Sequence, residues 1–195
     1  VVHSPELFAG DHVMDLCSSD AAYRQRSIDE LQRVIDITRQ LARHFRRADR
    51  PAIIINAGGF SADGPIPADR RPAMYDLIGQ ALASLDSEGV EIIPQTMPPY
   101  PWHFGGQRYH NLFMTADDIV SFSRKFDVRI CLDISHSALA ATHARKSFRS
   151  FLEEVGPVTR HLHIVDAEGV DGEGLQIGEG TIDFAMVASV IDRVA

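Results

Sequence analysis

Short apolar runs rich in β-branched residues alternate with longer amphipathic stretches along this chain, which limits it to a few α/β folds. The strand-like runs are residues 1–4, 52–56, 90–95, 128–133 and 161–165. In the stretches between and after them, apolar residues recur every three or four positions, the spacing of a helix with one buried face. These helical stretches are residues 28–41, 74–85, 119–126, 148–155 and 183–194. Regular strand–helix alternation predicts parallel strands with right-handed crossovers.

Two of the expected helices begin with a capping box, in which a hydroxyl residue is followed three positions later by an acidic residue. Ser27 and Glu30 form one such pair, and Thr115 and Asp118 form the other. We therefore expect Ser27 and Thr115 to be the N-caps of their helices.

Polar residues mark the ends of the strand-like runs. They are His3, Asn56, Gln95, Asp133 and His163. In a β/α barrel the carboxyl ends of the strands converge on the face that carries the active site, so this placement favours a barrel over an open sheet. No Gly-x-Gly-x-x-Gly follows the first strand, which disfavours the nucleotide-binding open sheets. We predict an α/β fold of the (β/α) TIM barrel type.

The length of the chain predicts that the barrel is incomplete. A full barrel has eight strands in roughly 250 residues, whereas this chain has 195 residues and five expected strand–helix units. We expect one domain over residues 1–195, truncated at both ends. Because the first residue is Val rather than Met, we expect the natural N-terminus to lie upstream.

The composition disfavours nucleic acid and membrane as partners. The chain has 27 acidic and 19 basic residues, a net charge of −8, whereas duplex DNA is bound largely through clustered Lys and Arg. The basic stretch at residues 39–50 is interpreted as a solvated helix face. No apolar run reaches the about 20 residues that span a bilayer. Cys17 and Cys131 lie far apart without metal-ligand spacing, which predicts reduced, packed thiols in a cytoplasmic protein.

The richest group of potential metal ligands follows the last two strand-like runs. Asp133 ends an apolar strand and His136 follows on the expected loop, so the pair offers one oxygen and one nitrogen ligand to a divalent cation. Strand alternation places His161 and His163 on the same side. His163, nearer the carboxyl end, is the better ligand, while His161 is either a deeper ligand or a hydrogen-bonded core histidine.

The loop at residues 97–111 follows the strand that ends in Gln95 and is expected on the active face. Its Trp102 is suited to stack on a sugar ring, Arg108 to hold a phosphate or carboxylate, and His103 or His110 to transfer protons. The alternative is a proline-stiffened cover that only shields the core. We favour a functional loop, because loops on this face of a barrel carry specificity.

A glycine-rich turn precedes the last helix. The amides of Gly178 and Gly180 could cradle a phosphate or hydroxyl group, and Glu179 between them could instead stabilise the start of the helix. Asp166 either orients a neighbouring imidazole or caps its own loop, and we favour the cap.

These segments together resemble a known family. Residues 130–136 look like the Leu-Asp-x-x-His strand end of the xylose-isomerase-like, or apurinic-endonuclease-type, TIM barrels. Residues 161–166 followed by 177–184 are similar to that family's next strand and its Gly-x-Gly turn, and residues 2–5 resemble its His-x-Pro third strand. The matches cover most of the chain in the family's order. The resemblance implies that the chain holds about strands 3 to 7 of 8.

The resemblance also implies one to three divalent cations, with Mn²⁺, Mg²⁺ or Zn²⁺ as cofactor. By position, Asp133 and His163 look like metal ligands, and His136 resembles either a further ligand or a substrate-contacting histidine. Gln95 stands where the family has a catalytic, metal-binding glutamate. Its amide oxygen can coordinate a cation but cannot act as a general base. The family's eighth-strand glutamate would lie beyond Ala195, so we expect weak or no metal occupancy in residues 1–195.

Two functions of different class follow. The first is a metal-dependent sugar or sugar-phosphate isomerase or epimerase that works through an enediolate-type intermediate, with His136 and Gln95 at the reacting centre. The second is a non-catalytic sugar-binding or accessory domain of a larger enzyme, suggested by the neutral amides of Gln95 and Asn56. The apurinic endonuclease activity of some family members is disfavoured by charge and by the same amides. A homo-oligomer is compatible with the sequence.

Overall fold

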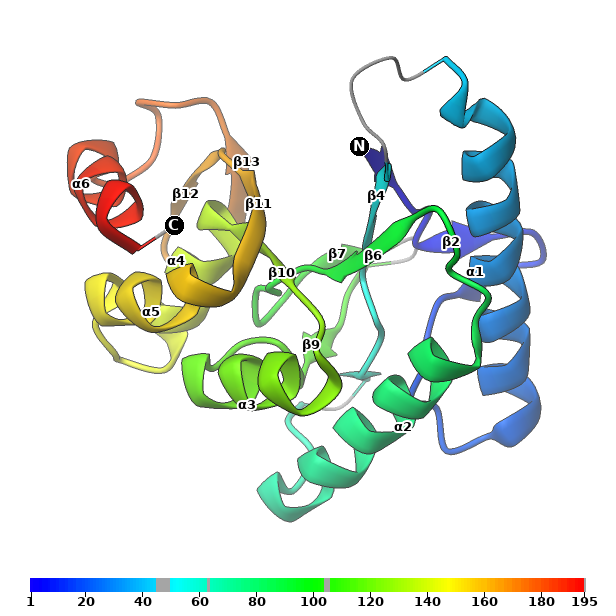
Figure 1. Ribbon diagram of the computed structural model, residues 1–195. Coiled ribbons are helices and arrows are strands. Elements are labelled where there is room, and N and C mark those ends of the chain that lie inside the picture. Colours follow the sequence, from blue (N-terminus) through cyan, green and yellow to red (C-terminus); the bar gives the residue numbers. More distant parts are fainter. Residues whose placement is uncertain (45–49, 63, 104–105, 195) are drawn as a thin grey trace. The chain divides into compact units, whose positions relative to one another are not determined.

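The computed structural model describes residues 1–44, 50–62, 64–103 and 106–194 (Figure 1). Its residues form two compact units. The first comprises Val1–Gly59 and Pro67–Pro94, and the second comprises Phe60–Ile66 and Gln95–Ala195. The single domain over residues 1–195 remains a prediction.

A parallel three-stranded sheet forms the centre of the first unit. Its order is β1-β4-β6, where β1 is Val2–His3, β4 is Ala52–Ile55 and β6 is Glu91–Pro94. Ile54 of β4 pairs with His3 on one side and with Ile93 on the other. All residues of β4 are buried, as expected for a central strand covered on both faces. The three predicted strands of this unit are confirmed.

Two helices and a hairpin complete the first unit. Helix α1, the long blue helix of Figure 1, spans Ala21–Ala42 and α2 spans Arg71–Ser84 after a 3₁₀ turn at Ala68–Arg70. Strands β2 (Leu7–Phe8) and β3 (His12–Val13) form an antiparallel hairpin.

The start of α1 differs from the prediction. Asp20 is the N-cap, because its side chain accepts the amides of Ala22 and Tyr23. Ser27 lies inside the helix, fully buried, and its Oγ accepts a hydrogen bond from the Asp15 amide. The predicted N-cap at Ser27 is therefore wrong, because an earlier acidic residue starts the helix about two turns sooner.

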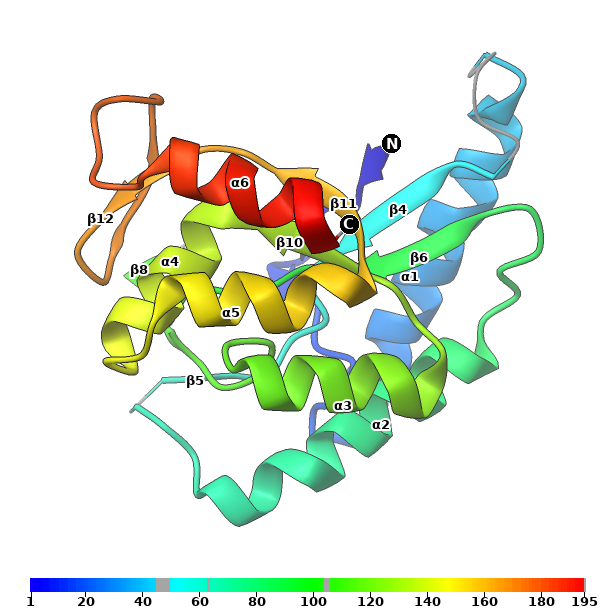
Figure 2. The same cartoon turned by 60° about the vertical axis from the view of Figure 1, so that its left-hand side comes forward.

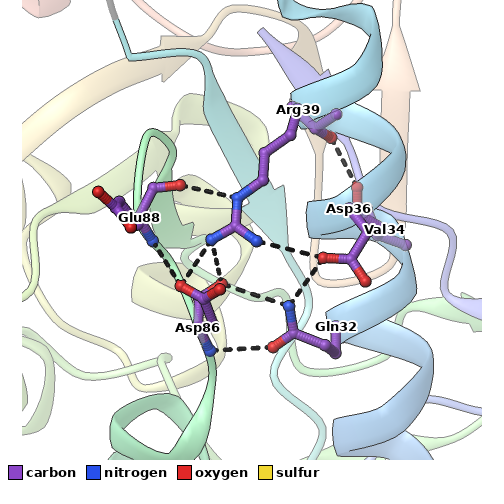
Figure 3. A network of polar contacts seen from close by, with 7 residues as sticks. Gln32, Val34, Asp36, Arg39, Asp86 and Glu88 are labelled. Carbon is purple, nitrogen blue, oxygen red and sulfur yellow. Dashed lines mark hydrogen bonds and ion pairs between the residues drawn. The ribbon is translucent and has the colours of Figure 1, made fainter.

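Arg39 binds α1 to the loop that follows α2 (Figure 3). Its guanidinium donates to the Glu88 carbonyl oxygen at 2.8 Å, and to the Asp86 carbonyl and carboxylate oxygens at 2.8 and 2.7 Å. Gln32 adds a reciprocal contact, accepting the Asp86 amide at 2.9 Å. The expected solvated face holds for Arg43 and Arg50, which are exposed, whereas Arg39 is partly buried. Residues 45–49 of the predicted basic stretch at residues 39–50 lie outside the described residues.

The second unit is built on two parallel strands, β10 (Ile130–Asp133) and β11 (Thr159–His163). Gln95 forms a further parallel bridge with Cys131. The helices are α3 (Ala116–Phe126), α4 (Ile134–His143), α5 (Phe148–Val155) and α6 (Phe184–Val194), with a 3₁₀ turn at Gly156–Val158. Helices α5 and α6 pack side by side (Figure 2). Thr115 caps α3 as predicted, accepting the Asp118 amide.

Helix α4 was not predicted, and it changes the setting of His136. Ser, Thr and His make up half of α4, so the helix lacks the continuous apolar stripe by which an amphipathic helix is recognised in a sequence. His136 therefore lies in the first turn of α4, and its predicted place on a loop is wrong.

Three short antiparallel ribbons also belong to the second unit. They are β5 (Phe60–Ser61) with β9 (Tyr109–His110), β7 (Trp102–His103) with β8 (Gly106–Gln107), and β12 (Asp166–Glu168) with β13 (Gly172–Leu175). Strands this short carry too little periodicity to be recognised from sequence. None of the described helices is long and apolar enough to cross a membrane.

We expect Arg39→Ala to lower the urea midpoint of unfolding, because three hydrogen bonds from one guanidinium join α1 to residues 86 and 88. The matched control is Arg33→Ala, whose guanidinium pairs with Glu30 of the same helix. The urea midpoint of Arg39→Lys should lie between those of the two alanine variants, since an ammonium group cannot reproduce the planar set of donors of a guanidinium. Equal midpoints for the Arg39→Ala and Arg33→Ala variants would contradict this role.

Candidate active site

Asp133 is fixed by two sets of hydrogen bonds where β10 passes into α4. Its Oδ1 accepts the His136 amide at 2.9 Å, which makes it the N-cap of α4. Its backbone amide donates to Thr96 Oγ1 at 3.0 Å, and the same hydroxyl donates to the Asp133 carbonyl oxygen. A carboxylate at the N-cap stabilises the start of a helix, because it accepts a free backbone amide and its negative charge is favourable at that end of the helix. These contacts leave Oδ2 as the oxygen that faces the neighbouring histidines.

Two imidazoles lie next to Asp133 Oδ2. His163 Nδ1 is 3.4 Å from it and His136 Nδ1 is 3.7 Å from it. The first contact follows from register, because β10 and β11 pair Asp133 with His163 and paired residues of parallel strands project from the same face. The structure therefore brings Asp133, His136 and His163 together in one unit, as the sequence predicted.

The charges of this cluster stabilise one another. Burial alone would raise the pKa of Asp133, but a hydrogen bond from His163 and the charge of His136 outweigh it, so the pKa lies below its ordinary value. Burial would lower the pKa of His136, but Glu173 and Asp133 outweigh it and hold that pKa above its ordinary value. Both shifts favour the charged forms.

Glu173 is a member of the site that sequence reasoning missed. It lies on β13, and its Oε2 is 3.5 Å from His136 Nε2. That separation is within ion-pair range, but Oε2 makes no hydrogen bond of good geometry with any described residue. The sequence does contain a signal for it, because Gly-Glu-Gly occurs at residues 172–174 as well as at 178–180.

Gln95 presents an unsatisfied acceptor. Its side chain is 3% exposed, and its Oε1 accepts no hydrogen bond from the described residues. The bridge between Gln95 and Cys131, together with strand alternation, places the Gln95 side chain on the same face as Asp133. A buried carbonyl oxygen without a donor costs free energy unless a ligand satisfies it.

The donor chemistry of three residues fits a divalent cation. A carboxylate from Asp133, an imidazole from His163 and the unsatisfied amide oxygen of Gln95 form the kind of mixed oxygen and nitrogen set that such ions take. Within the described part of the chain, no group of three or more His, Cys, Asp or Glu residues is already arranged to hold a metal ion. Among the described residues, the further donor on this face is of another type, the amide oxygen of Gln95.

His136 fits the predicted role of metal ligand poorly. The nitrogen nearer Asp133 is Nδ1, and it lies 2.9 Å from the Thr96 carbonyl oxygen. Since a carbonyl oxygen only accepts, Nδ1 carries the proton. No lone pair of His136 therefore faces the Asp133 carboxylate, and the ring is arranged as a hydrogen-bond donor.

The loop at residues 97–111 divides into anchored and exposed parts. Tyr100 and Tyr109 pack against His143 of α4, with ring centroids 5.7 Å apart in both pairs. Trp102 is 63% exposed. The Arg108 guanidinium lies 5.0 Å from the centre of the Phe60 ring, a cation–π contact.

The two histidines predicted to act in this loop are His103 and His110, and only the side chain of His110 is among the described residues. His110 is fully buried in the β5–β9 ribbon, and its Nδ1 bonds to the Leu112 carbonyl oxygen at 3.1 Å. A contact of His110 with substrate therefore remains a prediction, and the burial of the ring does not favour it.

Asp166 caps its own loop, as favoured from the sequence. Its two carboxylate oxygens accept the amides of Ala167, Gly178, Gly180 and Ile182. Gly178 and Gly180 donate to Oδ2 at 2.9 and 3.0 Å, so these amides are not available to cradle a ligand. The predicted substrate contact through them is corrected accordingly. A Cβ at Gly180 would lie 2.4 Å from Asp166 Oδ1, which explains the glycine.

The remaining strand-end residues have local partners. His3 and Asn56 belong to the first unit, where His3 Nδ1 bonds to the Ser4 carbonyl oxygen and Asn56 Oδ1 accepts the Gly58 amide. His161 meets His163 edge to face at 5.3 Å. Burial, followed by the charge of His163, lowers the pKa of His161, which suits a neutral neighbour of the site.

Comparison with known proteins identifies the family. Residues 1–195 match the family model described as a xylose isomerase-like TIM barrel. The chain belongs to the xylose isomerase-like TIM barrel family. Both the resemblance and the TIM-barrel fold class expected from the sequence are thereby confirmed. Among curated proteins, none matches the chain.

Solved structures of this family share the fold. A D-tagatose 3-epimerase-like protein is 21% identical with a TM-score of 0.70, over 99% of this chain and 66% of its own length. A xylose isomerase domain protein from Planctomyces limnophilus is 14% identical with a TM-score of 0.63, over 94% of this chain and 60% of its own. A xylose isomerase-like TIM barrel protein from Mycobacterium smegmatis, solved in complex with magnesium, is 10% identical with a TM-score of 0.56. The match covers 90% of this chain and 59% of that protein. This chain thus spans less than two thirds of each relative.

We expect Asp166→Ala to lower the urea midpoint of unfolding at neutral pH, because four backbone amides lose their acceptor. Burial would raise the pKa of Asp166, but those amides lower it below its ordinary value. The stabilisation is therefore fully present above the pKa of an unfolded Asp, about 4, and is lost as the pH falls through the lower folded pKa.

Midpoints of the wild-type protein and the variant should accordingly converge as the pH is lowered below about 4. Glu179→Ala, which removes an exposed carboxylate from the same turn, is the control and should leave the midpoint unchanged. A Glu179→Ala loss equal to that of Asp166→Ala would show that the cap has no special role.

Proposed function

We propose that this chain holds a divalent cation and a sugar at the carboxyl ends of β10 and β11, as part of a sugar isomerase or epimerase. The observation that supports it most is the contact of Asp133 Oδ2 with His163 Nδ1 at 3.4 Å. An anionic oxygen and an imidazole nitrogen meet there at the strand ends where barrels of this family carry their active sites. The unsatisfied Gln95 oxygen on the same face adds a third donor.

The cation is Mn²⁺, Mg²⁺ or Zn²⁺, held by Asp133 and His163 with Gln95 as an auxiliary ligand. When bound, such an ion polarises substrate oxygens and thereby acidifies an adjacent C–H group. The proposed reaction is an isomerisation or epimerisation of a sugar or sugar phosphate through an enediolate-type intermediate.

His136 is the proposed proton-transfer residue. Its Nδ1 donates to the Thr96 carbonyl oxygen at 2.9 Å, which fixes one nitrogen of the ring. The other nitrogen, Nε2, faces Glu173. An imidazole with a raised pKa can donate a hydrogen bond to an oxygen that gains negative charge. The Gln95 amide neither gains nor loses a proton near neutral pH, so Gln95 takes no part in proton transfer.

The substrate contacts are assigned to the loop at residues 97–111. Trp102 is exposed, and an exposed indole face can stack on the apolar face of a sugar ring. Arg108, steadied over Phe60, and His103 are the proposed contacts to a phosphate or hydroxyl group.

A non-catalytic sugar-binding domain is the second candidate. It is favoured by the neutral amide at Gln95 and by the lack, among the described residues, of a ready three-ligand group of His, Cys, Asp or Glu. A measurement of metal binding distinguishes the two candidates, because only the isomerase or epimerase requires a bound cation. Cleavage of DNA at abasic sites is the third, and the net charge of −8 weighs against it.

Asp133→Asn tests the cation site with little disturbance of the fold, because an amide oxygen can still accept the His136 amide at the helix cap. We expect the wild-type protein to bind Mn²⁺ and the variant to bind it at least tenfold more weakly, roughly the scale on which even outer ligands act. Free Mn²⁺ is measured by electron paramagnetic resonance during titration.

Asp192→Ala removes an exposed carboxylate of α6 and is the matched control, with no expected change in Mn²⁺ binding. With a panel of ketoses and ketose phosphates, turnover should require the cation and be lost in Asp133→Asn. Turnover that persists in this variant would reject the assignment, and a protein that binds sugar but no cation would favour the accessory domain.

A further inference from the structure

The two carboxylate oxygens of Glu173 contact two different parts of the second unit. Oε1 accepts a hydrogen bond from the Trp102 backbone amide at 3.3 Å. Oε2 is buried and lies 3.5 Å from His136 Nε2. One side chain therefore touches both the exposed loop segment that carries Trp102 and the imidazole at the start of α4.

The surroundings of His136 make Glu173 the residue that completes its orientation. On one side the ring is held at Nδ1 by the Thr96 carbonyl oxygen, and Asp133 lies 3.7 Å from the same nitrogen. On the other side, Nε2 faces the carboxylate of Glu173. Because Nδ1 is hydrogen-bonded to Thr96 and Nε2 faces the Glu173 carboxylate at 3.5 Å, a flip of the ring would break the first contact and lose the favourable charge at the second.

The β12–β13 hairpin is shaped so that Glu173 can occupy this position. A Cβ at Gly172 would lie 2.6 Å from the Glu168 carbonyl oxygen, and Gly174 has a φ of +77°, so both neighbours of Glu173 are required to be glycine. Asp166 holds the start of the hairpin through its backbone contacts. The hairpin packs against α4, the helix that carries His136.

We propose that Glu173 is a positioning residue that couples the loop carrying Trp102 to the orientation of His136. Through Oε1 it holds the loop near the site, and through Oε2 it keeps the imidazole in one orientation. The role deepens the proposed function, because loop and histidine would then be ordered together around a sugar. The coupling itself is a property of this chain and can be measured without substrate or metal.

Two variants distinguish the effect of the Trp102 contact from the effect of the His136 contact. Glu173→Gln keeps an amide oxygen that can accept the Trp102 amide but removes the charge that faces His136. Glu173→Ala removes both contacts. Glu168→Gln, which changes an exposed acid of the same hairpin, is the matched control.

Two spectroscopic signals report on the two contacts. Trp102 is the only tryptophan of the chain, so time-resolved fluorescence anisotropy measures the motion of this loop alone. The imidazole ¹⁵N signals of His136, assigned by comparison with His136→Gln, report on the ring. Urea midpoints and circular dichroism establish that each variant is folded.

We expect Glu173→Ala to increase the fast motion of Trp102 and to shift the His136 Nε2 signal. Glu173→Gln should shift the His136 signal while Trp102 remains as ordered as in the wild-type protein, and Glu168→Gln should change neither. The proposal is overturned if a folded Glu173→Ala protein leaves both signals unchanged. It is also overturned if Glu168→Gln produces the same changes, because the hairpin as a whole would then be responsible. If these signals behave as expected while Mn²⁺ binding fails, the coupling stands and the proposed function falls.

Discussion

The register between β10 and β11 is the constraint on which the site depends. It pairs Asp133 with His163, and because paired residues of parallel strands share a face, an acid and an imidazole are brought within 3.4 Å. The N-cap bond from Asp133 to the His136 amide then sets the position of the second imidazole. A shift of one residue along either strand would place these groups on opposite faces and remove the site.

The parts of the structure that follow from periodic patterns were predictable from sequence. The strands that end in Asp133 and His163, the cap at Thr115 and the long helices all have local signals that agree with their final environment. The placement of Asp133, His136 and His163 together followed from one further rule, that the carboxyl ends of barrel strands converge. Family resemblance and physical pattern led to the same residues.

The missed features share a physical cause, since each depends on contacts between residues distant in sequence. Helix α4 has Ser, Thr or His at half of its positions, so its burial could not be read from a hydrophobic stripe. His110 resembles a catalytic histidine in sequence, but it is fully buried in the β5–β9 ribbon. Glu173 owes its position to a hairpin whose ends are held by Asp166 and by glycine geometry. Such tertiary determinants leave only weak traces in a single sequence.

The central claim is that Asp133 and His163, assisted by Gln95, bind one divalent cation. Anomalous X-ray diffraction from crystals soaked in Mn²⁺ tests it most directly. The account predicts an anomalous peak about 2.0–2.3 Å from Asp133 Oδ2, with His163 and Gln95 also in the coordination sphere and His136 outside it. A Mn²⁺ peak elsewhere in the protein, with none beside Asp133, would contradict the account.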